Sequence, residues 1–314
     1  MRRLLMLLLG LVTAAATAQP APDCPPQAGA PSAEQRAEAA AAPRDRGFLW
    51  RISRDGRSSW LYGTVHLARL AWTVPGPRVA AALAASDVVA LELDVDDPAL
   101  MQRLRAGMAA QRGFALPPEL DTRLRRQLAA ACLPAALFDV MSPQMVATTL
   151  VVLAGRRAGL DPAWGIDPAL GRAARSLGKP VRSLETPEQQ LALLHSQSAD
   201  DAQESVEKIV DGLESGRALP MLQRVVQVWA DSRHDELADY PAWCDCAGSE
   251  RERAQMAAVL DARNPALADG IDALHRQHGR VFAAVGSLHM IGEQGLPALL
   301  AARGFTVERI AFDR

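Results

Sequence analysis

Two histidines close the same short pattern at opposite ends of the chain. Gly63 and His66 enclose Thr-Val at the end of one apolar run, and Gly286 and His289 enclose Ser-Leu at the end of another. The glycine three residues before each histidine lets the backbone turn without obstruction by a side chain. A single Gly-x-x-His is a weak signal, because a lone histidine at a strand end is often only hydrogen-bonded in a loop. Two of them, each opening a loop before a predicted helix, favour a shared site.

Glu92 is the third residue whose type and place suggest chemistry, because it interrupts an otherwise apolar run. A carboxylate there is costly to bury unless it is paired or bound to a metal. Together with His66 and His289 it would form a suitable ligand set for a divalent transition metal. An ion with open coordination positions lowers the pKa of a bound water and so makes a nucleophile.

Two other roles for Glu92 stay open from the sequence. It could serve as a general base, because burial can tune a carboxylate toward a neutral pKa. It could also belong to a purely structural cluster, paired with a buried arginine such as Arg51 or Arg263. The sequence therefore predicts a metal or catalytic site at these three residues, with a structural polar cluster as the alternative.

The elements that would position these residues alternate between strands and helices. Apolar, β-branched runs bounded by turn residues predict strands at 48–52, 60–66, 88–94, 180–184, 280–289 and 305–310. Helices are predicted at 78–85, 121–131, 201–213 and 295–303, and from Pro187 onward with Thr186 as its cap. Asp55-Gly56 is a tight-turn signal that would join the first two strands as a hairpin.

These elements predict an α/β fold. Residues 58–95 form a strand–helix–strand unit, whose two strands run parallel in nearly all known cases. We expect a central, mostly parallel sheet built from the N- and C-terminal parts, with a mainly helical insertion at about 98–262. Because ligands gather at the carboxyl ends of parallel strands, both Gly-x-x-His patterns fall at the binding edge of such a sheet.

The first residues have the character of an export signal. Arg2 and Arg3 precede an apolar run at 4–12, and Ala16-Thr-Ala18 forms a small-x-small cleavage site before Gln19. The apolar run is too short to span a bilayer as a helix. We expect a signal peptide at 1–18, cleavage near Ala18–Gln19, and a periplasmic or secreted mature chain without a membrane anchor. Residues 19–46, rich in Pro and Ala, read as a flexible tether before one domain at 47–314.

The net charge limits the kinds of partner that the chain can bind, and its cysteines can form disulfides in an oxidising compartment. The formal net charge is −2, which makes the chain a poor candidate for binding nucleic acid. Four cysteines in an oxidising compartment allow three pairings. Because Cys24 lies in the predicted tether, we expect Cys132 to pair with Cys244 or Cys246. The Cys-x-Cys spacing is too tight for a zinc knuckle.

Several motifs resemble those of the TraB/GumN family, which is related to the Tiki proteases. The similarity runs from about residue 48 to 310 and includes both Gly-x-x-His patterns with the glutamate strand between them. The other matching segments are Gly-Ile-Asp at 165–167, Leu-Glu-Thr-x-Glu-Gln-Gln at 184–190, Arg263-Asn264, and the closing signature at 285–296. Ser287 stands where small residues such as Ala are usual, which is a conservative change.

The resemblance implies a single α/β domain and, in the Tiki branch, a peptidase that depends on manganese- or cobalt-like ions. Carried over by position, His66, Glu92 and His289 become the metal and catalytic residues. Around them we expect four residues to support the site or the substrate, with the arginine balancing negative charge: Gly63, Gly286, Glu185 and Arg263. The TraB branch is tied to inactivation of peptide pheromones, and the GumN branch travels with exopolysaccharide genes. This chain is most similar to the short, secreted GumN-like kind, and its missing anchor departs from Tiki and TraB.

Three functions follow as expectations. The first is an exported metal-dependent hydrolase that acts on a peptide or protein substrate. The second is a non-catalytic periplasmic protein that binds a metal, a haem-like ligand or a peptide. The third is an accessory factor for exopolysaccharide, in which the site is a relict.

Overall fold

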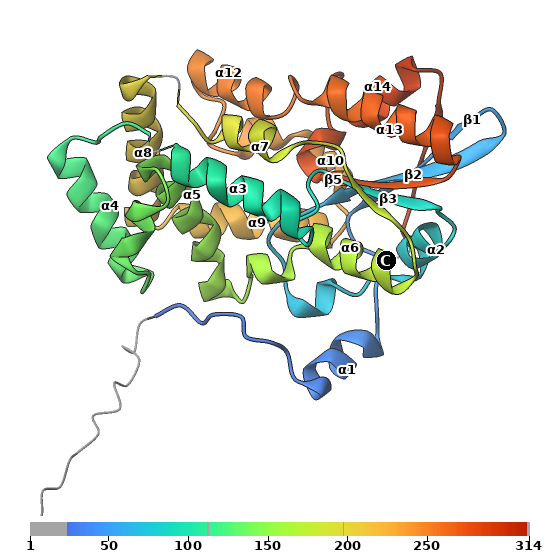
Figure 1. The fold of residues 1–314 in the computed structure, drawn as a ribbon, viewed down its shortest axis with the longest axis horizontal. Coiled ribbons are helices and arrows are strands. Elements are labelled where there is room, and N and C mark those ends of the chain that lie inside the picture. Colours follow the sequence, from blue (N-terminus) through green and yellow to red (C-terminus); the bar gives the residue numbers. More distant parts are fainter. Residues whose placement is uncertain (1–23, 112, 197, 313–314) are drawn as a thin grey trace, which may run out of the picture.

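The computed structural model describes residues 24–312 apart from 112 and 197 (Figure 1). The predicted signal peptide at 1–18 lies outside the described residues. None of the helices in this described part combines the length and apolar character that a membrane crossing requires.

The six strands form one sheet in the order β4-β3-β5-β2-β1-β6. Strand β1 runs antiparallel to both of its neighbours, whereas the other neighbouring pairs are parallel. The strands are β1 (Phe48–Arg54), β2 (Arg57–Thr64), β3 (Val88–Leu91), β4 (Val181–Ser183), β5 (Val281–Gly286) and β6 (Thr306–Ile310). The prediction of an α/β fold with a mostly parallel sheet is confirmed.

Strand β5, from the C-terminal part of the chain, lies between β2 and β3 in the sheet. It pairs in parallel with both, so that Thr64 lies opposite Gly286 and Leu91 opposite Ala284. Residues 281–285 of β5 are completely buried, as expected for a central strand covered on both faces. Because all three strands point the same way, their carboxyl ends meet at one edge of the sheet.

The loops after these strands start earlier than the sequence pattern suggested. Strand β3 ends at Leu91, so Glu92 follows the strand and does not lie within it. Strand β5 ends at Gly286, and His289 lies in a short 3-10 turn over Ser287–Met290. The apolar run continues past each strand because Met290 is buried and Leu93 lines a cavity beside the end of β3. The three candidate residues therefore belong to loops at the sheet edge.

The segment between β3 and β5 is mainly helical and contributes only β4 to the sheet (Figure 1). The helices are α1 (Ala33–Ala41), α2 (Pro77–Ala84), α3 (Pro98–Ala110), α4 (Pro118–Ala130), α5 (Pro143–Ala154), α6 (Ile166–Ser176), α7 (Pro187–Leu193), α8 (Ala199–Glu214), α9 (Ala218–Ala230), α10 (His234–Ala238), α11 (Tyr240–Trp243), α12 (Glu250–Val259), α13 (Asn264–His278) and α14 (Leu296–Ala302). Helices α4, α5 and α8 share a small core of their own, away from the sheet. Helix α7 begins at Pro187 as predicted, with Thr186 as its N-cap and Gln189, within the first turn, completing a capping box.

The predicted flexible tether is wrong for part of its length. Residues Ala33–Ala41 form α1, whose start is fixed by a capping box between Ser32 and Gln35. The chain after α1 lies on the domain, where the Asp45 carboxylate accepts hydrogen bonds from the backbone N–H groups of Arg78 and Val79. The prediction from Pro- and Ala-rich composition did not take this local capping signal into account. The alanines after it favour a helix and continue it.

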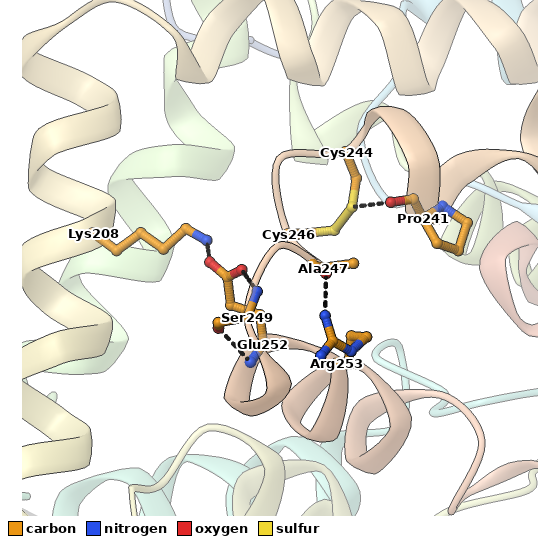
Figure 2. The surroundings of a disulfide bond; sticks show 8 residues. All are labelled: Lys208, Pro241, Cys244, Cys246, Ala247, Ser249, Glu252 and Arg253. Carbon is orange, nitrogen blue, oxygen red and sulfur yellow. Dashed lines mark hydrogen bonds and ion pairs between the residues drawn. A yellow bond between two sulfur atoms is a disulfide. The ribbon is translucent and has the colours of Figure 1, made fainter.

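The predicted cysteine pairing is also wrong. Cys24 pairs with Cys132, and Cys244 pairs with Cys246 (Figure 2). The described N-terminal segment lies against the domain, which brings Cys24 to the end of α4. Asp245, between the other two cysteines, has a φ of 52°. This left-handed turn brings two cysteines that are only two residues apart to one side of the loop before α12.

Candidate functional site

The side chains of His66, Glu92 and His289 converge at the carboxyl ends of β2, β3 and β5. A Cβ atom placed on Gly286 would lie 3.1 Å from Glu92 Oε1, 3.6 Å from His66 Nε2 and 3.7 Å from His289 Cδ2. The missing side chain at this glycine thus leaves room for all three groups. The same glycine donates its backbone N–H to Glu92 Oε1 over 2.6 Å.

Asp167 orients the imidazole of His66. Its Oδ2 lies 2.8 Å from His66 Nδ1, and its Oδ1 accepts a hydrogen bond of 2.6 Å from the Thr64 hydroxyl. The negative charge of Asp167 raises the pKa of His66 to about 9. Because Nδ1 faces this carboxylate, Nε2 is the nitrogen turned toward Glu92 and Gly286. The sequence motif at 165–167 contains Asp167, but its link to His66 spans 101 residues and needs the fold.

Asn264 orients the imidazole of His289 in the same way. Its side-chain NH₂ donates to the Gln294 carbonyl over 2.7 Å, which leaves Oδ1 facing His289 Nδ1 at 2.6 Å. His289 Nδ1 therefore carries a proton, and Nε2 presents its lone pair to Arg263 Nη1 at 3.1 Å. Burial lowers the pKa of His289 to about 4, so this imidazole is neutral at pH 7.

Arg263 connects the two glutamates of the site. Its Nη2 donates to Glu92 Oε2 over 2.6 Å, and its Nε and Nη2 form a two-point contact with Glu185 at 2.9 and 2.5 Å. Gln190 adds a hydrogen bond of 2.6 Å to Glu185. All three charged side chains are at most 12% exposed. Of the two arginines considered for Glu92, Arg263 is the partner, whereas Arg51 pairs with Glu308 at the surface.

The pKa of Glu92 moves opposite to the general-base hypothesis. Burial by itself would raise this pKa, but the charges of His66 and Arg263, the proton that His289 takes up at low pH and the N–H of Gly286 outweigh burial and lower it to about 2. Glu92 is therefore ionised throughout the neutral range. A base with so low a pKa is poorly matched to proton abstraction near pH 7. In this environment Glu92 stays negatively charged and can attract or bind a positively charged group.

The predicted supporting residues fall into two groups. Glu185, Arg263 and Gly286 lie in the site itself. Gly63 lies behind it, where its carbonyl accepts a hydrogen bond of 2.7 Å from the buried Trp229 indole. A Cβ atom on Gly63 would lie 3.0 Å from Ser287 Oγ, so this glycine permits close packing of the two loops and does not line the site.

Burial of His289 makes the folding stability of the chain dependent on pH. Its pKa is about 4 in the folded chain, below the ordinary value of about 6.5 in an unfolded chain. The unfolded state therefore takes up the proton first as the pH falls, and stability is lost from about pH 6.5 down to the folded pKa. We expect the wild type to lose about 2 kcal/mol through His289 between pH 7 and pH 5. A His289→Gln variant, measured by urea unfolding in chelator, should lack that part of the loss; an identical pH profile would contradict this.

His66, Glu92 and His289 are residue types that ligate divalent metals, but Arg263 stands among them, and the raised pKa of His66 means that an ion would have to displace its proton at pH 7. Both imidazoles have Nδ1 held by an acceptor, which is the arrangement that prepares Nε2 as a metal ligand, and Gly286 leaves the space between them open. In this arrangement, however, Arg263 contacts both Glu92 Oε2 and His289 Nε2. Within the described residues, no group of three or more His, Cys, Asp or Glu side chains is arranged to hold an ion.

Comparison with known proteins gives a match at the level of the family. The model of the TraB/PrgY/gumN family matches residues 48–309. The matched stretch includes every residue of the site described above. No curated protein and no solved structure matches the chain.

Proposed function

The chain belongs to the TraB/PrgY/gumN family, and from this membership and the site geometry we propose that it is an exported metal-dependent hydrolase of peptide bonds. The observation that carries the proposal is the pair of oriented imidazoles. His66 and His289 each have Nδ1 tied to an acceptor from another element, at 2.8 and 2.6 Å. Both rings lie around the same glycine as the ionised carboxylate of Glu92.

The residues that would hold the ion are His66, Glu92 and His289. Such an ion, when bound, would polarise the scissile carbonyl and lower the pKa of a water molecule. Asp167 and Asn264 would keep the two imidazole nitrogens pointed at it. Arg263 would place positive charge beside the reacting carbonyl, where negative charge develops as the bond is attacked. Glu185 would hold the guanidinium at that position through its two-point contact.

The two disulfides support a location outside the cytoplasm. Cys24–Cys132 and Cys244–Cys246 would persist only in an oxidising compartment. This agrees with the export signal expected from the sequence at 1–18. We propose a periplasmic or secreted mature protein.

One observation favours the competing hypothesis of binding without turnover. Both oxygens of Glu92 already accept hydrogen bonds, from Gly286 and from Arg263. A cluster whose charges are balanced in this way can be structural, or can bind a ligand by exchanging one ion pair for another. This hypothesis predicts stoichiometric binding and no product.

The experiment that separates the two is a search for products. The purified mature chain is incubated with a mixed peptide library in manganese, cobalt or zinc, and in chelator, and the peptides are read by mass spectrometry. The hydrolase proposal predicts new termini in at least one metal sample and none in chelator. Intact peptides in every sample would refute it, and a ligand retained on the protein would then support binding.

A Gly286→Ala variant tests whether the open space at this glycine matters. Its backbone angles, φ −49° and ψ 137°, suit alanine, so the fold should tolerate the change. The new Cβ would press on Glu92 Oε1 at 3.1 Å and displace the site, for which we expect about a 10²-fold loss of peptide cleavage. Gly212→Ala on α8, where a Cβ meets nothing within 4 Å, is the matched control. Equal rates for the two variants would exclude this role.

A further inference from the structure

A cavity of about 450 Å³ opens beside the site and has a different chemistry from it. One end is formed by His66, Glu92 and Gln190. The remaining wall is largely apolar and comes from the loop after β3, from α3, α5 and α7 (Figure 1), and from residues 162–168 at the start of α6, where Asp167 lies beside His66. The side chains that matter most for its chemistry are Val95, Leu104, Met108, Met141, Met145 and Leu191.

The two threonines in this wall add little polarity. The hydroxyl of Thr148 donates to the Gln144 carbonyl over 3.0 Å, and that of Thr149 donates to the Met145 carbonyl over 2.8 Å. Both hydroxyl protons are thus used within α5. The cavity therefore offers its hydrogen-bonding groups almost entirely at the His66–Glu92 end.

The helices that form the wall are held closely against one another. A Cβ atom on Gly107 of α3 would lie 2.3 Å from Leu191 Cδ1 of α7, so these two helices are in direct contact. Leu104 and Met108 lie one turn apart on α3 and face the same cavity. The backbone frame is thereby fixed, whereas the methionine side chains remain adaptable in shape.

We propose that this cavity binds an apolar side chain of the peptide substrate, next to the bond that the site cleaves. This inference rests on the proposed hydrolase function and adds its specificity. Leucine, methionine or phenylalanine would be accepted, because three methionines can adjust to different apolar shapes. An aspartate would be rejected, because along the apolar wall its charge would lose water without gaining a partner.

Val95 allows the cavity to be changed without disturbing the core. It lines the cavity and is 41% exposed, so a Val95→Glu substitution should leave folding intact while placing a charge at the rim. Leu177, on the loop after α6, is 52% exposed and lies outside this cavity. Leu177→Glu is therefore the matched control for an added surface charge.

The test measures binding in chelator, where metal-dependent turnover is absent. Fluorescein-labelled peptides of one sequence, with leucine, methionine or aspartate at a single central position, are titrated with wild type and both variants by anisotropy. We expect the leucine and methionine peptides to bind the wild type at least about 10-fold more tightly than the aspartate peptide. Val95→Glu should weaken leucine-peptide binding by about 10-fold, and Leu177→Glu should leave it within about 2-fold.

Three results would overturn the proposal: equal affinity for all three peptides, equal effects of the two variants, or no binding of the leucine peptide up to millimolar concentration. Displacement of a bound dye by dodecanoate but not by the leucine peptide would instead assign the cavity to an acyl chain. The hydrolase proposal is judged separately by product formation with metal. Selective binding without cleavage would refute only the hydrolase, and cleavage without side-chain preference would refute only the cavity assignment.

Discussion

Replacing Glu92 by glutamine should lower peptide cleavage by about 10²- to 10³-fold, the usual cost of removing one group that stabilises charge in the transition state. The substitution removes one negative charge beside both histidines. It keeps an oxygen that can accept the Gly286 N–H, now bound over 2.6 Å. Arg263 also keeps its two-point contact with Glu185. Activity should therefore fall much further than stability.

Glu188→Gln is the matched control for this variant. Glu188 lies on α7 and pairs with Arg103 at the protein surface. Cleavage of the product-forming library peptides is followed by mass spectrometry for wild type and both variants at equal concentration. A Glu92→Gln rate equal to that of Glu188→Gln would remove Glu92 from the catalytic machinery.

Replacing Arg263 by methionine should lower the free energy of unfolding by about 3–5 kcal/mol, because it leaves two buried carboxylates without their cation. Glu92 and Glu185 both lie within hydrogen-bond distance of Arg263 Nη2, at 2.6 and 2.5 Å. Their side chains are only 8% and 7% exposed, so water cannot replace the lost partner. The loss is measured by urea unfolding in chelator.

Arg103→Met provides the comparison for an exposed ion pair. The Arg103–Glu188 pair has side chains that are 50% and 60% exposed, and such surface pairs contribute about 0–1 kcal/mol. The Arg263 variant should therefore be clearly less stable than the Arg103 variant. Similar stabilities for the two would mean that the glutamates of the site find other partners.

The sequence predicted where the strands lie along the chain, but not their order in the sheet. Apolar runs and turn residues placed β1 to β6 close to their observed bounds, and the parallel direction of β2 and β3 followed from the strand–helix–strand unit. The position of β5 between them did not follow, because periodicity reports burial and not strand order. Yet that insertion is what brings His289 beside His66 and Glu92.

The residues of the candidate site could be named from the sequence, but not the contacts between them. The repeated Gly-x-x-His pattern and an isolated glutamate pointed to His66, Glu92 and His289. Asp167 and Asn264 lie in the family-like segments at 165–167 and 263–264, but their role in orienting the two imidazoles did not follow from the sequence, because the contacts with His66 and His289 exist only in the fold. The low pKa of Glu92 was not predicted for a related reason: the sequence indicated burial, whereas the contacts of this carboxylate with Arg263 and the Gly286 N–H exist only in the fold.

Two errors came from reading composition in place of local signals. The Ala- and Pro-rich N-terminal segment was expected to be a flexible tether, but Ser32 and Gln35 are spaced for a capping box and begin a helix. With that segment ordered on the domain, Cys24 reaches Cys132. The pairing of Cys244 with Cys246 depends on a left-handed turn at Asp245, which no spacing rule predicts.

The central claim, that His66, Glu92 and His289 hold a metal ion, is tested most directly by thermal unfolding at increasing manganese, cobalt or zinc. An ion that binds only the folded chain raises the melting temperature with concentration. We expect such a rise for wild type and for a His278→Ala control, and its loss in His66→Ala, Glu92→Gln and His289→Ala. No rise in wild type with any of the ions, or an equal rise in the three site variants, would contradict it.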